Sequence, residues 1–237
     1  MIYFGTAKVT GDMYRSAYEN ESNMDGVTIN GKEYSSMEEY LYGRRVVANT
    51  KIGEYVNYKC DYDNDGNTKD DWRVFYNDEK NVYLISNKYT ETSVQLSEYK
   101  QEEKALAYLL NEEIWGERYG NELAKYVHGG PTKEMFLNSY YSKYPNGDVN
   151  DDTLYNIYLT GNVMCGGMWL ATIEDEGWLA RTMNGGPVTS NYTDLGGVNI
   201  AGYWMTGIRP IVCLKENVII TDGNGTLEQP YELSINQ

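Results

Sequence analysis

The stretch Gly-Ile-Arg-Pro-Ile-Val-Cys-Leu-Lys, residues 207–215, decides the fold of this chain. Its aliphatic residues form a short, largely β-branched run, which predicts a buried strand. Arg209 lies inside this run, so we expect a carboxylate or a backbone carbonyl to match its charge. The preceding segment, residues 166–206, is rich in Gly, Asn, Tyr, Trp and Thr and has no steady hydrophobic period. A rigid strand beside a long aromatic segment indicates that this half of the chain carries the function.

The composition excludes several classes of partner. The chain has 237 residues, with 20 basic and 35 acidic side chains and a formal net charge of −15. Such a charge disfavours binding to nucleic acid or to an anionic bilayer. No apolar run approaches the roughly 18 residues of a membrane-spanning helix, and residues 1–6 do not resemble a signal peptide. We therefore expect no membrane insertion, and export would use another route, such as lysis, or a leader missing from this sequence.

Tyrosine is far more frequent than phenylalanine, with 24 residues against 3. A tyrosine ring is a rigid apolar body with a polar tip, and it loses little conformational entropy on binding. Surfaces rich in Tyr, Asn, Ser and Gly are therefore typical of binding faces. The alternative is that many of these rings lie in ordinary β-sheet, where aromatic residues are also favoured.

The three cysteines, Cys60, Cys165 and Cys213, are an odd number and cannot form a complete disulfide framework. Cys165 and Cys213 are the candidate pair, because both lie in strand-like, apolar surroundings. The simpler interpretation is that all three are buried free thiols.

Residues 1–50 are interpreted as an N-terminal lead-in or assembly arm. Asn30-Gly31 between strand-like flanks predicts a β-hairpin there. Ser36 predicts the N-cap of a helix over residues 37–47. The other elements expected in the lead-in are an edge strand over residues 2–9 and a short helix within residues 11–20.

Three alternating segments after the lead-in predict an antiparallel meander. They are residues 54–60, 72–76 and 82–86.

The first loop of the meander, residues 61–71, is acidic. Asp61, Asp63 and Asp65, followed by a glycine, match the opening of a D-x-D-x-D-G calcium loop, in which alternating carboxylates surround a hard cation. Trp72 stands where an EF-hand has its bidentate glutamate, and no helix is predicted before the loop. A solvated acidic loop is therefore the preferred interpretation, and a Ca²⁺ site is the alternative.

The middle of the chain, residues 96–145, has mainly helical spacing. Apolar residues at helical spacing run from residue 104 to Tyr119 and predict one helix. The helical region as a whole ends at Gly129-Gly130. A proline then opens a second helix over residues 132–144.

The rest of the chain returns to β-structure. Residues 169–172 and 178–181 predict two paired strands, and a long loop over residues 184–203 follows. Strands over residues 217–221 and 231–233 flank a Gly-rich turn.

Common catalytic motifs are missing. The chain has no Gly-rich phosphate loop, C-x-x-C pair, H-E-x-x-H or G-x-S-x-G motif. The single histidine, His128, gives no support to a Ser-His-Asp or Cys-His site, and we expect it to be structural. Two carboxylates among Glu174, Asp175 and Glu176 could serve a glycosidase, but adjacent acids on a loop are more often solvated. We expect no enzyme activity and no cofactor.

Three motifs occur in a defined order. They are Gly-Gly-Pro-Thr-Lys-Glu-Met-Phe at residues 129–136, Met-Trp-Leu-Ala at residues 168–171 and Gly-Ile-Arg-Pro-Ile-Val at residues 207–212. In this order they resemble proteins of gut Firmicutes and their phages, which are similar to the C-type lectin-like variable proteins diversified by retroelements. The similarity covers roughly residues 52–233 and leaves out the lead-in.

The resemblance implies an α+β, C-type lectin-like domain over residues 51–237, with antiparallel sheets, two or more helices and long irregular loops. It also implies a non-catalytic receptor or adhesion module. Residues 172–204 would be the variable region, which a reverse transcriptase rewrites. The positions that the resemblance implies as invariant scaffold are Trp169, Leu170, Gly207, Arg209 and Pro210.

The candidate ligand contacts lie at the variable region. Large amphipathic side chains beside polar groups suit recognition when a rigid frame holds them; the alternative for each tryptophan of this part of the chain is a place in the core. We expect a protein or glycan ligand on a cell surface, an extracellular, cell-surface or virion location, and a module that could form homo-oligomers. The candidate contacts are Glu174, Asp175, Glu176, Trp178, Arg181, Asn184, Asn191, Tyr192, Asp194, Tyr203 and Trp204.

A structural subunit of a virion or surface assembly is the alternative function. Its aromatic loops would pack against neighbouring subunits, and residues 1–50 would serve as the assembly arm.

Overall fold

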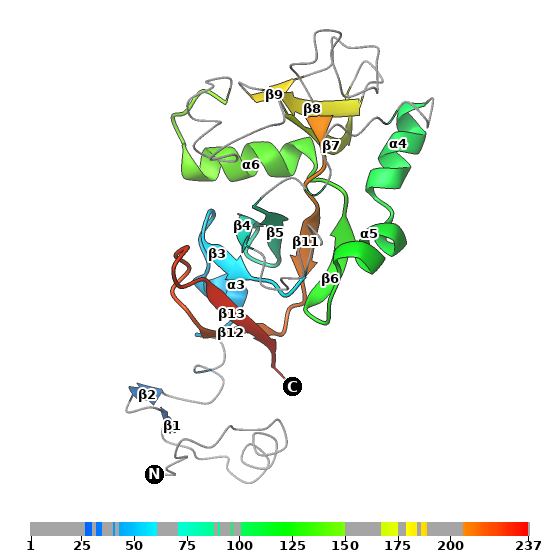
Figure 1. Ribbon diagram of the computed structural model, residues 1–237. Helices are drawn as coiled ribbons and strands as arrows, with labels where there is room; N and C mark the ends of the chain where they lie inside the picture. Colours follow the sequence, from blue (N-terminus) through cyan, green and yellow to red (C-terminus); the bar gives the residue numbers. More distant parts are fainter. Residues whose placement is uncertain are drawn as a thin grey trace.

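The computed structural model describes residues 27–29, 32–34, 40, 43–60, 71–87, 90, 96, 101–149, 167–174, 179–183, 186–188 and 206–236. Over these residues the protein has an α+β fold, as the sequence predicted (Figure 1).

The larger sheet has seven strands. In spatial order they are β12 (Val218–Asp222), β13 (Tyr231–Ile235), β3 (Tyr55–Asn57), β4 (Asp71–Asn77), β5 (Val82–Ser86), β11 (Ile211–Leu214) and β6 (Ala124–His128). Neighbouring strands are antiparallel, except that β13 and β3 are parallel.

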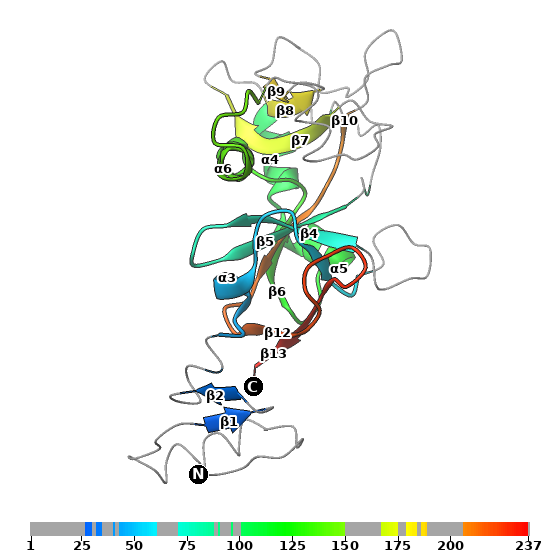
Figure 2. The same cartoon turned by 90° about the vertical axis from the view of Figure 1, so that its left-hand side faces the viewer.

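The smaller sheet has four strands. In spatial order its strands are β10 (Thr206–Gly207), β7 (Gly167–Ile173), β8 (Leu179–Met183) and β9 (Gly186–Val188). A separate hairpin joins β1 (Val27–Ile29) to β2 (Lys32–Tyr34). Figures 1 and 2 show the smaller sheet at one end of the molecule, the hairpin near the N-terminus at the other, and the larger sheet between them.

The helices connect and cover the sheets. α6 (Lys133–Lys143) packs against β4 of the larger sheet and β7 of the smaller one, so it joins the two (Figure 1). α4 (Glu102–Leu109) packs against β7 and β8, and α5 (Glu112–Tyr119) packs against β6. The short α3 (Val46–Asn49) packs against β12. No helix in the described part of the chain is long and apolar enough to span a bilayer.

Strand β11 is buried on both faces. Ile211 and Cys213 point into a core cluster that α6 covers, through Phe136 among others. Val212 and Leu214 point into a second cluster, beside α4 and α5. Because neither face meets water, the strand has no polar positions, which explains why the sequence reads as a continuous apolar run.

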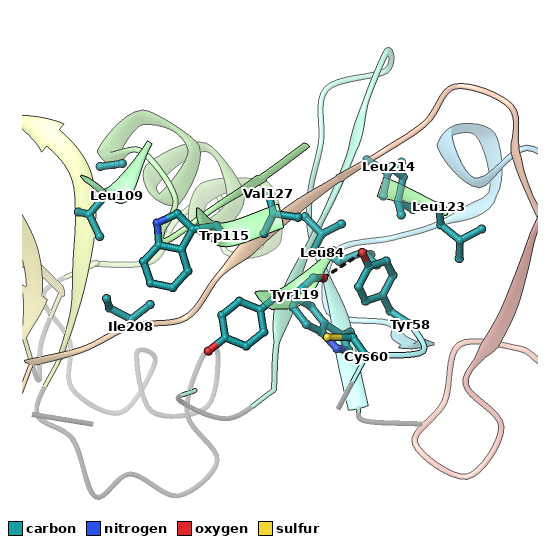
Figure 3. Packing of buried hydrophobic residues seen from close by; sticks show 14 of the residues in the cluster. Tyr58, Cys60, Leu84, Leu109, Trp115, Tyr119, Leu123, Val127, Ile208 and Leu214 are labelled. Carbon is teal, nitrogen blue, oxygen red and sulfur yellow. Dashed lines mark hydrogen bonds between the residues drawn. The ribbon is translucent and has the colours of Figure 1, made fainter. Parts of the chain in front are cut away.

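Several tyrosines belong to the second cluster (Figure 3). The ring of Tyr58 is buried, and its hydroxyl donates to the carbonyl oxygen of Tyr119 at 3.1 Å. The indole of Trp115 is fully buried, and its Nε1 donates to the carbonyl of Tyr108 at 2.8 Å. Part of the Tyr-rich composition thus lies in the core, and the polar tips of Tyr58 and Trp115 are hydrogen-bonded there.

The helix predicted from residue 104 to Tyr119 is in fact two helices. The side chain of Asn111 accepts from the amide of Ile114 at 3.0 Å and caps α5, so a new helix begins there. The prediction also missed β6. Val127 of β6 pairs with Val212 of β11, and burial on the sheet outweighs helical spacing in this segment.

The helix predicted over residues 37–47 does not continue to its predicted end. Gly43 and Arg44 form a turn, and α3 begins only at Val46. The amide of Ile220 in β12 donates to the carbonyl of Arg44 at 2.8 Å, and Nε of Arg44 donates back to the carbonyl of Ile220 at 3.0 Å. Pairing with the sheet edge therefore replaces the helical turn that local preference favoured.

The other predicted elements have mixed outcomes. The hairpin β1–β2, the meander β3–β4–β5, helix α6, the pair β7–β8 and strands β11 to β13 are confirmed. Strand β9 lies where a loop was predicted. The predicted elements over residues 2–9 and 11–20 lie outside the described residues, as do Asp61, Asp63 and Asp65 of the candidate calcium loop.

Cys213 is a buried thiol that is not in a disulfide, so the suggested pair with Cys165 is wrong. Cys165 itself lies outside the described residues. Burial raises the pKa of the Cys213 thiol above its ordinary value. This cysteine therefore serves as a small core residue between Tyr83 and Tyr126, its neighbours on the adjacent strands.

Candidate functional site

Strand β7 forms the base of the candidate site. Met168 and Leu170 face the cluster under α6, whereas Trp169 and Ala171 face the cluster beside α4 and α5. Trp169 is only 2% exposed, so it is a core residue. A place in the core was the alternative to ligand contact for the tryptophans in this part of the chain. Burial on both faces makes β7 a rigid frame.

The segment predicted to be variable, residues 172–204, begins and ends beside this one strand. It starts at Thr172 near the end of β7, and the chain returns in β10, which pairs in parallel with the beginning of β7. The paired residues are Thr206 with Gly167 and Gly207 with Met168. A long segment whose two ends are fixed on one buried strand can change its middle without moving the frame.

The segment Gly129-Gly130 brings helix α6 against β7. A Cβ atom on Gly129 would lie 2.5 Å from Cε2 of the buried Trp115 indole. A Cβ atom on Gly130 would lie 2.6 Å from the carbonyl oxygen of Trp169. Both distances are far below van der Waals contact, so only glycine fits at these two positions.

The next residues attach the start of α6 to β7 by hydrogen bonds. The amide of Ala171 donates to the carbonyl of Pro131 at 2.8 Å. The Thr132 side chain accepts from the amide of Met135 at 3.1 Å and caps the helix. The amide of Lys133 donates to Oγ1 of Thr172 at 2.9 Å. The side chain of Thr172 thereby satisfies one of the free amides at the helix start.

An ion pair completes this attachment. Nζ of Lys133 lies 2.8 Å from Oε2 of Glu174, and the two side chains are 25% and 14% exposed. Oε1 of Glu174 is buried and has no hydrogen-bond partner among the described residues. Little of this carboxylate is therefore available to a ligand.

The candidate contacts separate into described and undescribed residues. Glu174 follows β7 and bonds to α6, as given above. Arg181 lies in β8, where its backbone pairs with Trp169 on one side and Val188 on the other. The candidates outside the described residues are Asp175, Glu176, Trp178, Asn184, Asn191, Tyr192, Asp194, Tyr203 and Trp204.

Sequence reasoning missed two residues of the attachment, Lys133 and Thr172. Lys133 lies in the Gly-Gly-Pro-Thr-Lys-Glu-Met motif, near the start of a helix that the sequence predicted. The sequence does not show which acid it meets, because residues 133 and 174 are far apart along the chain.

His128 has a structural environment. Its Nε2 lies 3.4 Å from Oε1 of Glu112, and its ring lies 4.7 Å from the ring of Tyr126. Burial lowers the pKa of His128, and the nearby Glu112 opposes this effect. Within the described part of the chain, no three His, Cys, Asp or Glu residues are arranged to hold a metal ion.

The chain was compared with protein-family models, with curated proteins and with solved structures, and none of the three comparisons gave a match. What the arrangement can do is therefore inferred from its own residues. A buried strand, fixed to a helix by hydrogen bonds and an ion pair, holds both ends of a long aromatic and polar segment.

Proposed function

We propose that the chain is a non-catalytic, ligand-binding module of the receptor or adhesion type, built on a C-type lectin-like scaffold. It presents residues 172–204 as a variable aromatic and polar surface to a protein or glycan on a cell surface. The observation that carries this proposal is that the segment leaves from the end of β7 and that the chain returns in β10, which pairs with the beginning of β7. The three sequence motifs lie at the start of α6, in β7, and from β10 into β11. Their order supports the lectin-like scaffold.

The chemistry of the segment suits recognition rather than catalysis. Trp178, Tyr192, Tyr203 and Trp204 offer rigid apolar bodies with polar tips. Carboxylates and amides beside them can accept and donate hydrogen bonds to sugar hydroxyls or to peptide groups. The strongly acidic chain directs this surface away from nucleic acid and anionic lipid.

Binding to arrays of glycans and to intact cells would test this proposal. We expect the wild-type protein to bind a defined subset, and Trp178→Ala or Tyr203→Ala to weaken that binding at least tenfold, because aromatic anchors dominate interfaces. Tyr141→Ala is the matched control: this tyrosine of α6 is 42% exposed and is not part of residues 172–204, so the variant should bind like wild type.

Two results would contradict the proposal. Binding that survives every aromatic substitution in the segment would place the contact elsewhere. Release of sugar from a glycan, abolished by Glu176→Gln, would instead indicate a carboxylate hydrolase.

A structural subunit is the second candidate function. The hairpin β1–β2 has only two strands, and among the described residues neither strand pairs with a third. A two-stranded hairpin alone is marginally stable in water, so contact with a neighbouring subunit would stabilise it. Oligomers that grow with protein concentration in light scattering, and that disappear when residues 1–42 are removed, would favour this function.

A further inference from the structure

We propose that Lys133 is a positioning residue for the recognition segment, and that Glu174 belongs to the frame rather than to the ligand-contacting surface. The two residues fix the point at which the chain leaves β7. The variable surface then begins at Asp175 and not at Thr172. This inference rests on the proposed function for its meaning, although the contacts themselves do not depend on it.

Lys133 bonds to the segment through two different groups. Its backbone amide donates to Oγ1 of Thr172, and its ammonium group lies 2.8 Å from Oε2 of Glu174. Thr172 and Glu174 are two residues apart, so they lie on the same side of the extended chain. Lys133 therefore holds both Thr172 and Glu174, which lie on the same side of the chain at the end of β7.

The burial of this pair makes it unlike a surface ion pair. Glu174 is 14% exposed and Lys133 is 25% exposed, so water screens their attraction only weakly. Oε1 of Glu174 is buried without a donor among the described residues, so the carboxylate depends on Lys133. Removing the ammonium group would leave a buried charge without compensation, which costs far more than the loss of a solvated pair.

The start of α6 is itself held firmly. Thr132 caps the helix, Gly130 lies against the carbonyl of Trp169, and the carbonyl of Pro131 accepts from the amide of Ala171. The Lys133–Glu174 pair extends this attachment beyond the last residue of β7. Side chains from Asp175 onward can then vary from a fixed starting point.

Amide hydrogen exchange of the full chain tests this inference without a ligand. In Lys133→Met we expect the protection of the Ala171 amide to fall at least tenfold. The Val74 amide, which donates to the carbonyl of Glu54 in the larger sheet, should change by less than about twofold. Lys133→Arg keeps the cation and should retain most of the protection.

The partner variant and a matched pair complete the experiment. Glu174→Gln should lower the protection of the Ala171 amide less than Lys133→Met does, because it leaves no buried carboxylate, and the double variant should recover part of the protection that Lys133→Met loses. The control is Lys125–Glu216, an ion pair at 3.4 Å whose side chains are 45% and 78% exposed. Lys125→Met should leave both amides as protected as in wild type.

The outcomes separate this inference from the proposed function. Unchanged protection of Ala171 in Lys133→Met, or an equal loss at Ala171 and Val74, would overturn the positioning role. Failure to find any ligand would count against the proposed function. It would not change what hydrogen exchange shows about the positioning role of Lys133.

Discussion

Gly130→Ala is expected to lower the free energy of unfolding by about 3 kcal/mol. The added Cβ atom would lie 2.6 Å from the carbonyl oxygen of Trp169, a backbone atom in the buried strand β7. A flexible side chain could turn away, but β7 cannot, because the amide of Ala171 is bonded to the carbonyl of Pro131 next to the substitution. Urea unfolding followed by circular dichroism measures the loss.

Gly116→Ala is the matched control for this substitution. Gly116 lies inside α5, and a Cβ atom there would meet nothing within 4 Å. Alanine is the better helix former, so this variant should be more stable than wild type by about 0.5–1 kcal/mol. Equal stability of the Gly130→Ala variant and wild type would show that α6 and β7 are not in close contact.

Arg209→Met is expected to destabilise the protein by a similar amount, about 3 kcal/mol. Arg209 is 1% exposed and lies just before β11. Its guanidinium group donates through Nε to the carbonyl of Ser86 at 2.8 Å, and through Nη2 to the same oxygen. The bond ties the entry of β11 to the end of β5, and methionine fills part of the space without supplying a donor.

Arg209→Lys tests whether the shape of the group matters as well as its charge. A lysine keeps the charge but cannot present two donors in a fixed plane, so we expect most of the destabilisation to remain. Lys104→Met, an exposed substitution on α4, controls for loss of charge alone and should leave the unfolding midpoint nearly unchanged. A stable Arg209→Met variant would mean that the buried charge is replaceable by an apolar side chain.

The partner of Arg209 was predictable in kind but not in identity. A charge inside an apolar run must meet a carboxylate or a carbonyl, and the structure supplies the carbonyl of Ser86. Ser86 lies at the end of β5, and it meets Arg209 because of the order of strands in the larger sheet. Local periodicity does not contain the order of strands.

Elements with a strong local signal were predictable. A continuous apolar run predicted β11, and Asn30-Gly31 between strand-like flanks predicted the hairpin β1–β2. Errors arose where tertiary contacts outweigh local preference. Residues 124–128 continue a helical region in sequence, yet they form the edge strand β6 because pairing with β11 buries Val127.

The candidate site was predictable in place and only partly in composition. The frame strand β7 and its tryptophan were visible in the motif at residues 168–171. The ion pair of Lys133 with Glu174 was not visible, since only the packing of α6 on β7 brings these two residues together. Glu174 was expected to contact a ligand because it is a polar residue close in sequence to large aromatic residues, and closeness along the chain does not show that its carboxylate pairs with Lys133.

Sequencing the coding region across a natural population tests the central claim, that a fixed frame carries a variable recognition segment. We predict that substitutions concentrate at residues 175–204 and that a near-copy of this segment lies beside a reverse-transcriptase gene. Residues of the frame should stay constant, in particular Gly130, Lys133, Glu174 and Arg209. Substitutions scattered evenly along the chain, with Lys133 and Glu174 as variable as Trp178, would contradict the account.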